Sequence, residues 1–251
     1  MKKLLLSAAM MAALSASAQS TTVRPKYVNT SGETIDTELV QQADTRLTRI
    51  FYQGYNTVCL PYALTAEEVS TMLGEGVKVE KAVGALVEGN DFVLCFGECT
   101  NEGMEAGMPY LVYSEKAKYV TITNSTGMSV NTPASVSFGD GQGNVATFQG
   151  SFERLQPVGT WAIPAVQGEV PANLICCDGA RMLNPTRCFF TWDAQNGASN
   201  MVIRHLGYGE TVTGIVGANI TTAEGFTYNT AGQRVQNGHG VMIQGGRKIV
   251  K

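Results

Sequence analysis

The sequence predicts an all-β protein: an antiparallel β-sandwich, with a β-barrel as the alternative, that carries one short helix and a small C-terminal β appendage. Short runs rich in Val, Ile, Phe and Tyr recur along the 251 residues, and turn sequences separate them. Glycine, with 28 residues, is abundant enough to supply many tight turns. Helical patterns of ~10–15 residues, which a βαβ protein needs between its strands, do not recur along the sequence.

Residues 1–18 have the pattern of a secretory signal peptide. Lys2 and Lys3 precede an apolar run from Leu4 to Leu14, and Ala16-Ser17-Ala18 forms a small-residue cleavage site. The apolar run is shorter than the ~20 residues that a permanent membrane helix needs. The sequence therefore predicts an exported protein, secreted or at the cell surface, with Gln19 as its first mature residue.

After a polar N-terminal leader at residues 19–45, residues 46–207 contain the predicted β-sandwich core. Pro61 ends one of the first strands, because proline has no N–H to donate to a neighbouring strand. The strands are predicted at residues 47–51, 55–60, 77–87, 92–96, 110–113, 119–123, 145–152, 160–163, 174–177, 188–192 and 201–206.

The predicted helix spans Ala66–Leu73 and has start and stop residues of its own. Thr65 is its expected N-cap, and Glu68 completes a capping box three residues later. Gly74 is expected to end it. A helix of two turns is held by packing against a larger body rather than by its own propensity.

Residues 208–224, rich in Gly, Thr and Ala, are predicted as a linker to a C-terminal β-hairpin motif at residues 225–251. Gly245-Gly246 has the composition of a two-residue hairpin turn. A unit this small is not stable alone. We therefore expect it to join the main sheet or to dock on a partner.

Charge and hydropathy exclude several classes of partner. Charged residues make up 16% of the chain, below the ~25% that is usual, and the net charge is −3 with no basic stripe. Nucleic-acid binding is therefore not expected, and nothing favours an anionic membrane. No apolar run after residue 18 reaches membrane-spanning length, so the mature chain is expected to lack a transmembrane segment.

The six cysteines are predicted to lie in a compartment where disulfides persist. Cys95 and Cys99 are close enough in sequence to pair across a small bulge or turn, and they are the candidate disulfide. The adjacent Cys176 and Cys177 would form a strained bond. Several of the six can instead be small buried hydrophobes. A zinc site is disfavoured, because the two histidines have no ligand-like spacing to a cysteine pair.

The candidate catalytic and metal-binding residues form no recognisable constellation. His205 and His239 are the available bases for nucleophilic hydrolysis, but the sequence has no Gly-x-Ser-x-Gly elbow and both are interpreted as ordinary edge or surface histidines. Glu98, Glu102 and Glu105 cluster in one stretch, which is interpreted as a solvated connection rather than a cation site. The sequence therefore predicts no catalytic residue, no metal and no cofactor.

Two further stretches carry ligand-binding alternatives. The turn Gly139–Asn144 offers oxygen atoms to calcium but lacks the acidic ladder and closing Glu of a calcium loop. Trp161 and Trp192, together with the nine tyrosines, are candidates for a sugar-binding aromatic platform. Packing in the core is the favoured interpretation of both tryptophans.

Several motifs resemble known secreted proteins. The pattern Asn56–Tyr62, then a short helix, then Glu105–Val112, resembles secreted Bacteroidota β-sandwich modules of unassigned function, and Phe148–Phe152 and Asn184–Phe190 look like later strands of that module. The ending Tyr228–Val235, with Gly240–Ile243 and Lys248, is similar to a short relative of the C-terminal sorting domain that the type IX secretion system recognises. The resemblance implies docking of the C-terminal hairpin on secretion or surface machinery, and it implies no functional residue.

The function expected from these observations is a surface or secreted binding or adhesion module, without catalysis, for an extracellular glycan or protein ligand. An extracellular hydrolase that uses acidic residues is one alternative. The other is a structural component of a surface assembly, in which the terminal hairpin completes the sheet of a neighbour.

Overall fold

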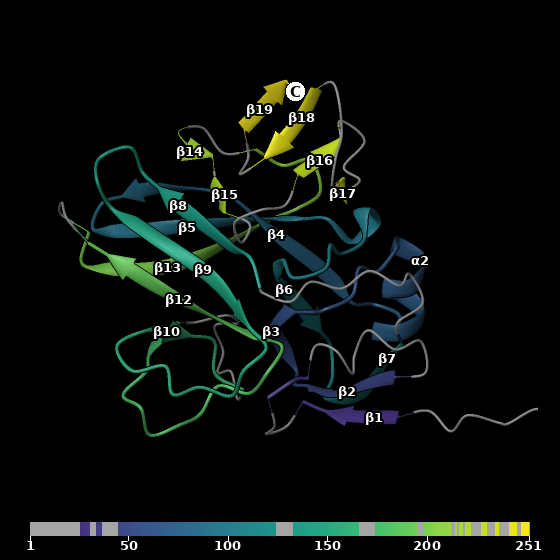
Figure 1. The fold of residues 1–251 in the computed structure, drawn as a ribbon. Coiled ribbons are helices and arrows are strands. Elements are labelled where there is room, and N and C mark those ends of the chain that lie inside the picture. Colours follow the sequence, from purple (N-terminus) through teal and green to yellow (C-terminus); the bar gives the residue numbers. More distant parts are fainter. Residues whose placement is uncertain are drawn as a thin grey trace, which may run out of the picture.

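A computed structural model describes residues 26–30, 34–36, 45–123, 133–165, 174–194, 198–211, 214, 216–217, 219–221, 227–229, 234–235, 241–244 and 247–250. The predicted signal peptide and His239 lie outside these residues. The described chain consists mostly of strands with one short helix, arranged as packed sheets, which confirms the predicted all-β, sandwich-like class (Figure 1).

The first sheet has three strands in the order β1 (Lys26–Asn29), β2 (Thr45–Phe51) and β7 (Lys118–Thr123). β1 runs parallel to β2, and β2 runs antiparallel to β7. Strand β1 lies in the stretch expected to be a polar leader. Side chains of β2 alternate between buried and half-buried, as expected for a sheet with one face on the core.

The second sheet is fully antiparallel and has six strands. Its order is β11 (Ile175–Cys176), β10 (Trp161–Ala162), β12 (Arg187–Asp193), β9 (Val145–Ser151), β8 (Ser135–Gly139) and β15 (Asn219–Thr221).

The third sheet has the order β13 (Asn200–Leu206), β5 (Asp91–Glu98), β4 (Lys78–Glu88), β6 (Pro109–Ser114) and β3 (Gly54–Cys59), and β14 (Val216–Gly217) also pairs with β4. β13 and β5 are parallel, whereas the other pairs are antiparallel.

The third sheet curls, and a bulge in β4 explains why. The register between β4 and β5 shifts between Ala82 and Gly84. Such a bulge bends a strand and increases its twist. The curl is strong enough to bring side chains of the two edge strands into contact, because the ring of Tyr55 in β3 stacks 3.9 Å from the ring of His205 in β13.

The predicted helix is present, with the predicted cap. α2 (Ala66–Glu68) continues as the π-helical turn η1 (Val69–Leu73), and both hydrogen bonds of the Thr65–Glu68 capping box are formed. Gly74 ends the segment with a φ of 97°. A 3-10 turn, η2 (Thr100–Glu102), follows β5. No helix in the described ranges is long and apolar enough to span a bilayer.

The C-terminal strands form a fourth, antiparallel sheet in the order β17 (Arg234–Val235), β16 (Thr227–Asn229), β18 (Val241–Gln244) and β19 (Arg247–Val250). It lies at the end of the molecule opposite to β1 (Figure 1). The stretch expected to be a linker contains β14 and β15, which pair with the third and second sheets. Runs of two or three residues are too short for a hydrophobic period to reveal them.

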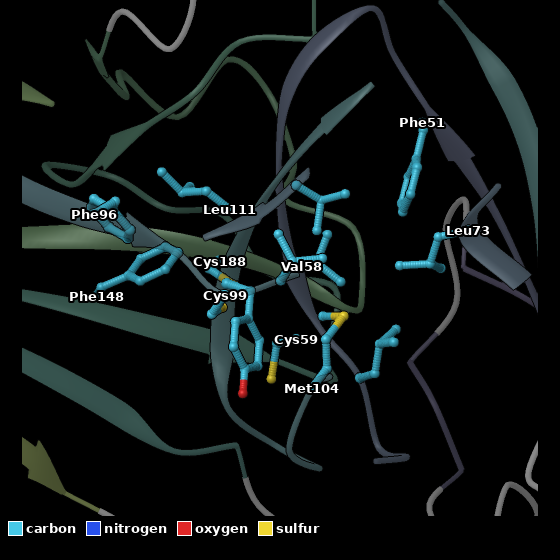
Figure 2. Packing of buried hydrophobic residues seen from close by; sticks show 14 of the residues in the cluster. Phe51, Val58, Cys59, Leu73, Phe96, Cys99, Met104, Leu111, Phe148 and Cys188 are labelled. Carbon is cyan, nitrogen blue, oxygen red and sulfur yellow. The ribbon is translucent and has the colours of Figure 1, made fainter. Parts of the chain in front are cut away.

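One main core joins the three large sheets. Phe96 of the third sheet contacts Phe148 and Phe190 of the second sheet, with ring centroids 5.5 and 6.3 Å apart. Figure 2 shows Cys59 and Cys188 near Val58 at the centre of this core. A smaller cluster on the other face of the third sheet contains Leu86, Val93, Cys95 and Leu206.

Candidate functional site

The outward face of the first sheet carries two of the most exposed aromatic side chains in the described chain. Tyr119 of β7 is 80% exposed, and Tyr27 of β1 is 61% exposed. The opposite face is buried, with Leu47 and Phe51 fully inaccessible. The outward side chains include Tyr27, Asn29, Arg46, Thr48, Ile50, Tyr119 and Thr121, and we call these seven the tyrosine face.

The pairing register places the two tyrosines at opposite corners of this face. Tyr27 lies opposite Arg46, and Tyr119 lies opposite Ile50, four residues further along β2. Four residues of strand span ~13 Å, and β1 and β7 lie ~10 Å apart on either side of β2, so the Cα atoms of the tyrosines are roughly 16 Å apart.

The groups between the rings are polar. Arg46 Nη1 donates to the Tyr27 hydroxyl at 3.3 Å, and its guanidinium lies 5.9 Å from the centre of the Tyr27 ring, which orients that ring. Thr48 and Thr121 face each other across β2 and β7. The face thus combines aromatic rings with hydroxyl and guanidinium groups on rigid strands, which suits a ligand with both C–H faces and hydroxyls.

The tryptophans singled out in the sequence pack instead of forming this platform. The rings of Trp161 and Trp192 are 5.9 Å apart at 71°, and Trp192 stacks on Phe92 at 6.4 Å. Both pack against the main core, as the favoured interpretation predicted.

The sequence signal for part of the tyrosine face was present in residues 119–123, because the apolar Val120 and Ile122 alternate with Tyr119 and Thr121.

His205 meets an acidic partner that sequence reasoning missed. Its Nδ1 lies 2.6 Å from Oε2 of the buried Glu80, and the Tyr55 hydroxyl donates to Oε1 of the same carboxylate at 3.0 Å. Burial, the charge of Glu80 and this hydrogen bond raise the pKa of Tyr55. His205 Nε2 is buried without a hydrogen-bond partner, and within the described ranges no Ser, Thr or Cys bonds to His205. The group formed by His205, Glu80 and Tyr55 therefore lacks the pair of nucleophile and base that a serine or cysteine hydrolase uses.

The three glutamates of the acidic stretch do not all meet at one point. Glu98 accepts a hydrogen bond from Thr100, whereas Glu102 forms an ion pair with Lys81. Glu102 and Glu105 line a cavity of 70 Å³ in which Lys81 is the positive group. Across the part of the chain that the structure describes, no group of three or more His, Cys, Asp or Glu side chains is arranged to hold a metal ion.

The turn at Gly139–Asn144 is closed by its own aspartate. Asp140 Oδ1 accepts from the backbone N–H groups of Gln142 at 2.7 Å and Asn144 at 3.1 Å. Burial acts to raise the pKa of Asp140, but these bonds and one from the Asn144 side chain lower it on balance. The carboxylate therefore serves the turn, which accounts for its position without calcium.

The structure does not bring Cys95 and Cys99 together. Both are free thiols, with Cys95 in the smaller cluster and Cys99 in the main core. The bulge or turn expected between them is absent, because Asp91–Glu98 is one continuous strand. Four residues of strand separate Cα atoms by ~13 Å, whereas a disulfide needs about 4.4–6.8 Å. The buried-hydrophobe alternative describes both residues.

The chain was compared with known protein families, curated proteins and solved structures. No family model, curated protein or solved structure gives a significant match to this chain. Sequence similarity therefore supplies neither a ligand nor an activity, and the tyrosine face is the candidate site that the side-chain chemistry itself supports.

Proposed function

We propose that this protein is an exported, non-catalytic module that binds glycan chains through the tyrosine face. The observation that carries the proposal is the placement of Tyr27 and Tyr119, both mostly exposed, on one outward face of a three-stranded sheet. An exposed tyrosine offers a large apolar ring beside a hydroxyl group, so two of them on one rigid face can contact the same extended ligand. The predicted signal peptide at residues 1–18 supports an extracellular ligand.

The composition of the face favours a glycan over a protein partner. Ile50 is its one aliphatic side chain, and it is half-buried. The centre of a protein–protein interface is more apolar than the rest of the surface, whereas Thr48 and Thr121 place hydroxyl groups between these rings. Sugar rings offer C–H faces to aromatic side chains and hydroxyls to these polar groups.

The test is a binding screen of soluble neutral and acidic polysaccharides against the mature chain, followed by two variants. Tyr27→Ala and Tyr119→Ala are each expected to weaken binding of a hit about 5- to 10-fold, since an aromatic contact contributes ~1 kcal/mol and 1.4 kcal/mol is tenfold. Tyr208→Ala is the matched control, because Tyr208 is 65% exposed but follows β13, outside the tyrosine face. Equal affinities for all four proteins, or no polysaccharide bound at millimolar concentration, would contradict the proposal.

A further inference from the structure

A cavity of 510 Å³ lies between the residues that follow β2 and those around β10 and β11. Its volume falls within the range of about 300–1,000 Å³ that is typical of small-molecule sites. It shares no residue with the tyrosine face. The side chains that matter for its chemistry are Tyr52, Ile163, Met182, Leu183 and Arg187.

Arg181 and Arg187 are the positively charged residues that line this cavity, and Arg181 is exposed, so Arg187 is the one whose position needs explanation. Its guanidinium lies 5.4 Å from the centre of the Tyr52 ring, and the side chain is half-buried. Burial lowers the pKa of Arg187, and it forms no ion pair with any carboxylate among the residues that the structure describes. Asp178 also lines the cavity, but it is exposed and its Oδ1 accepts from the Ala180 N–H at 2.8 Å.

The backbone before Arg187 is held in an unusual conformation. Thr186 has a φ of 63°, which a β-branched residue rarely adopts. Its carbonyl oxygen accepts from the Cys59 N–H at 2.9 Å and from Arg49 Nη1, which also donates to the Thr186 hydroxyl at 3.0 Å. Strain of this kind persists where the surroundings fix it and is found at ligand sites. Thr186 thus fixes the backbone from which the Arg187 side chain extends.

The electrostatics around Arg187 favour an anion. Burial, followed by the positive charge of Arg187, lowers the pKa of Arg49 to about 9. Within the described ranges Arg49, like Arg187, has no carboxylate partner, and its guanidinium bonds to Thr57 and Thr186. Two neighbouring guanidinium groups without a counter-charge create a positive potential, which a bound carboxylate would neutralise through charge-assisted hydrogen bonds.

Part of the cavity wall is apolar, beside the polar side chains of Asp178, Arg181 and Asn184. Ile163, Pro164 and Leu183 contribute to its wall. Ile175 and Met182 also line it and are 40% and 45% exposed. Exposed aliphatic side chains around a concave site suit a ligand whose body is apolar.

We propose that this cavity binds a small organic acid, with its carboxylate on Arg187 and its apolar body against Ile163, Met182 and Leu183. The site is separate from the tyrosine face, so it does not depend on glycan binding. A ligand with one anionic end and an apolar body matches Arg187 and the aliphatic part of the wall, whereas a sugar acid would place hydroxyls against those aliphatic side chains.

The experiment measures binding of octanoate and phenylacetate to the full mature chain by calorimetry or ligand-observed NMR. Both acids are expected to bind at least ~10-fold more tightly than their neutral counterparts 1-octanol and 2-phenylethanol, because a charge-assisted hydrogen bond contributes about 1.5–3 kcal/mol. Glucuronate supplies the same anion on a polar body, and it is expected to bind more weakly than octanoate.

Variants locate the site. Arg187→Gln is expected to reduce octanoate affinity at least ~10-fold, and Arg187→Lys by less, since lysine retains the charge but not the planar fork. Met182→Glu, at an exposed position, places a negative charge at the cavity and is expected to weaken binding without a folding defect. Arg154→Gln is the matched control, because Arg154 is exposed and outside the cavity.

Three results would overturn the proposal: neither acid binds at millimolar concentration, acids and alcohols bind equally, or folded Arg187→Gln and Met182→Glu both bind octanoate like the unmodified chain. Glucuronate binding as tightly as octanoate would overturn the apolar part of the ligand assignment. Arg187→Gln is expected to retain polysaccharide binding, so failure of the cavity site and failure of the tyrosine face give different results.

Discussion

His205 Nδ1 lies 2.6 Å from Glu80 Oε2, although the two residues are 125 positions apart in the chain. Glu80 is buried near the start of β4, and His205 lies near the end of the edge strand β13. Tyr55, from the other edge strand β3, stacks on the imidazole and donates to the same carboxylate. Glu80 therefore accepts hydrogen bonds that link both edges of the curled sheet, and its role is to hold that curl.

Glu80→Gln is expected to destabilise the protein. The substitution keeps the side-chain volume but replaces one carboxylate oxygen with an amide that cannot accept, so one buried donor loses its partner at a cost of about 1–3 kcal/mol. The free energy of unfolding, measured by urea denaturation, is the readout.

Glu88→Gln is the control for that measurement. Glu88 lies at the other end of β4 and pairs with Arg204 at the exposed surface, so the same chemical change is expected to have a much smaller effect. Equal losses of stability in the two variants would contradict the buried role assigned to Glu80.

Gly150→Ala is expected to destabilise the protein by about 1–3 kcal/mol, the usual cost of overpacking a core. A Cβ atom at Gly150 would lie 2.3 Å from Cys59 Sγ and 2.6 Å from Cys59 Cβ, and Cys59 is fully buried. Gly139→Ala, in the neighbouring strand β8, is the matched control because nothing lies within 4 Å of its added Cβ. Thermal unfolding of both variants checks the prediction, and a Gly150→Ala protein as stable as the control would refute the contact.

Thr65→Ala is expected to cost about 1 kcal/mol, because the Thr65 side chain accepts from the Glu68 N–H at 3.2 Å at the N-cap of α2. Thr71→Ala in η1 removes a hydroxyl that only donates back to the Glu67 carbonyl, so it is expected to be nearly neutral. Denaturant midpoints of the two variants give the comparison. A larger loss for Thr71→Ala would mean that the cap contributes little.

Local patterns explain why the capped helix and most strands could be predicted. The Thr65–Glu68 spacing acts within one turn, and residues 119–123 alternate within one strand, so a short window of sequence contains the whole signal. Strand β8 was not predicted, because Ser135–Gly139 has only two large apolar side chains. The short strands β14 and β15 are defined by the partners they pair with rather than by their own composition.

The candidate sites depend on long-range contacts, which no local pattern specifies. Tyr27 belongs to the tyrosine face because β1 pairs with β2, and its own stretch is polar. Arg187 matters because Tyr52 and the β10–β11 region surround it and because no carboxylate in the described ranges reaches it. These facts follow from the packing of separate sheets, so neither could be predicted from residue types alone.

Five of the six cysteines are expected to divide into two reactivity classes in the reduced, native protein. Burial raises the pKa of the thiols of Cys59, Cys95, Cys99 and Cys188, and that of Cys99 reaches about 12. Because the thiolate is the nucleophile, these four are expected to resist iodoacetamide at pH 8, whereas the exposed Cys176 is alkylated first. Peptide mass spectrometry after timed quenching gives the order of modification.

The same raised pKa values predict how stability depends on pH. A thiol whose pKa is higher in the folded chain contributes stability that is fully present below its unfolded pKa and is lost as pH rises through the folded value. For Cys99 that interval runs from the ordinary 9.0 to about 12. The free energy of unfolding of the reduced protein is therefore expected to fall less steeply across this interval in Cys99→Ala than in the unmodified chain. Identical slopes in urea titrations at pH 8.5 and 10.5, or rapid native alkylation of Cys99, would show that this thiol is not buried as described.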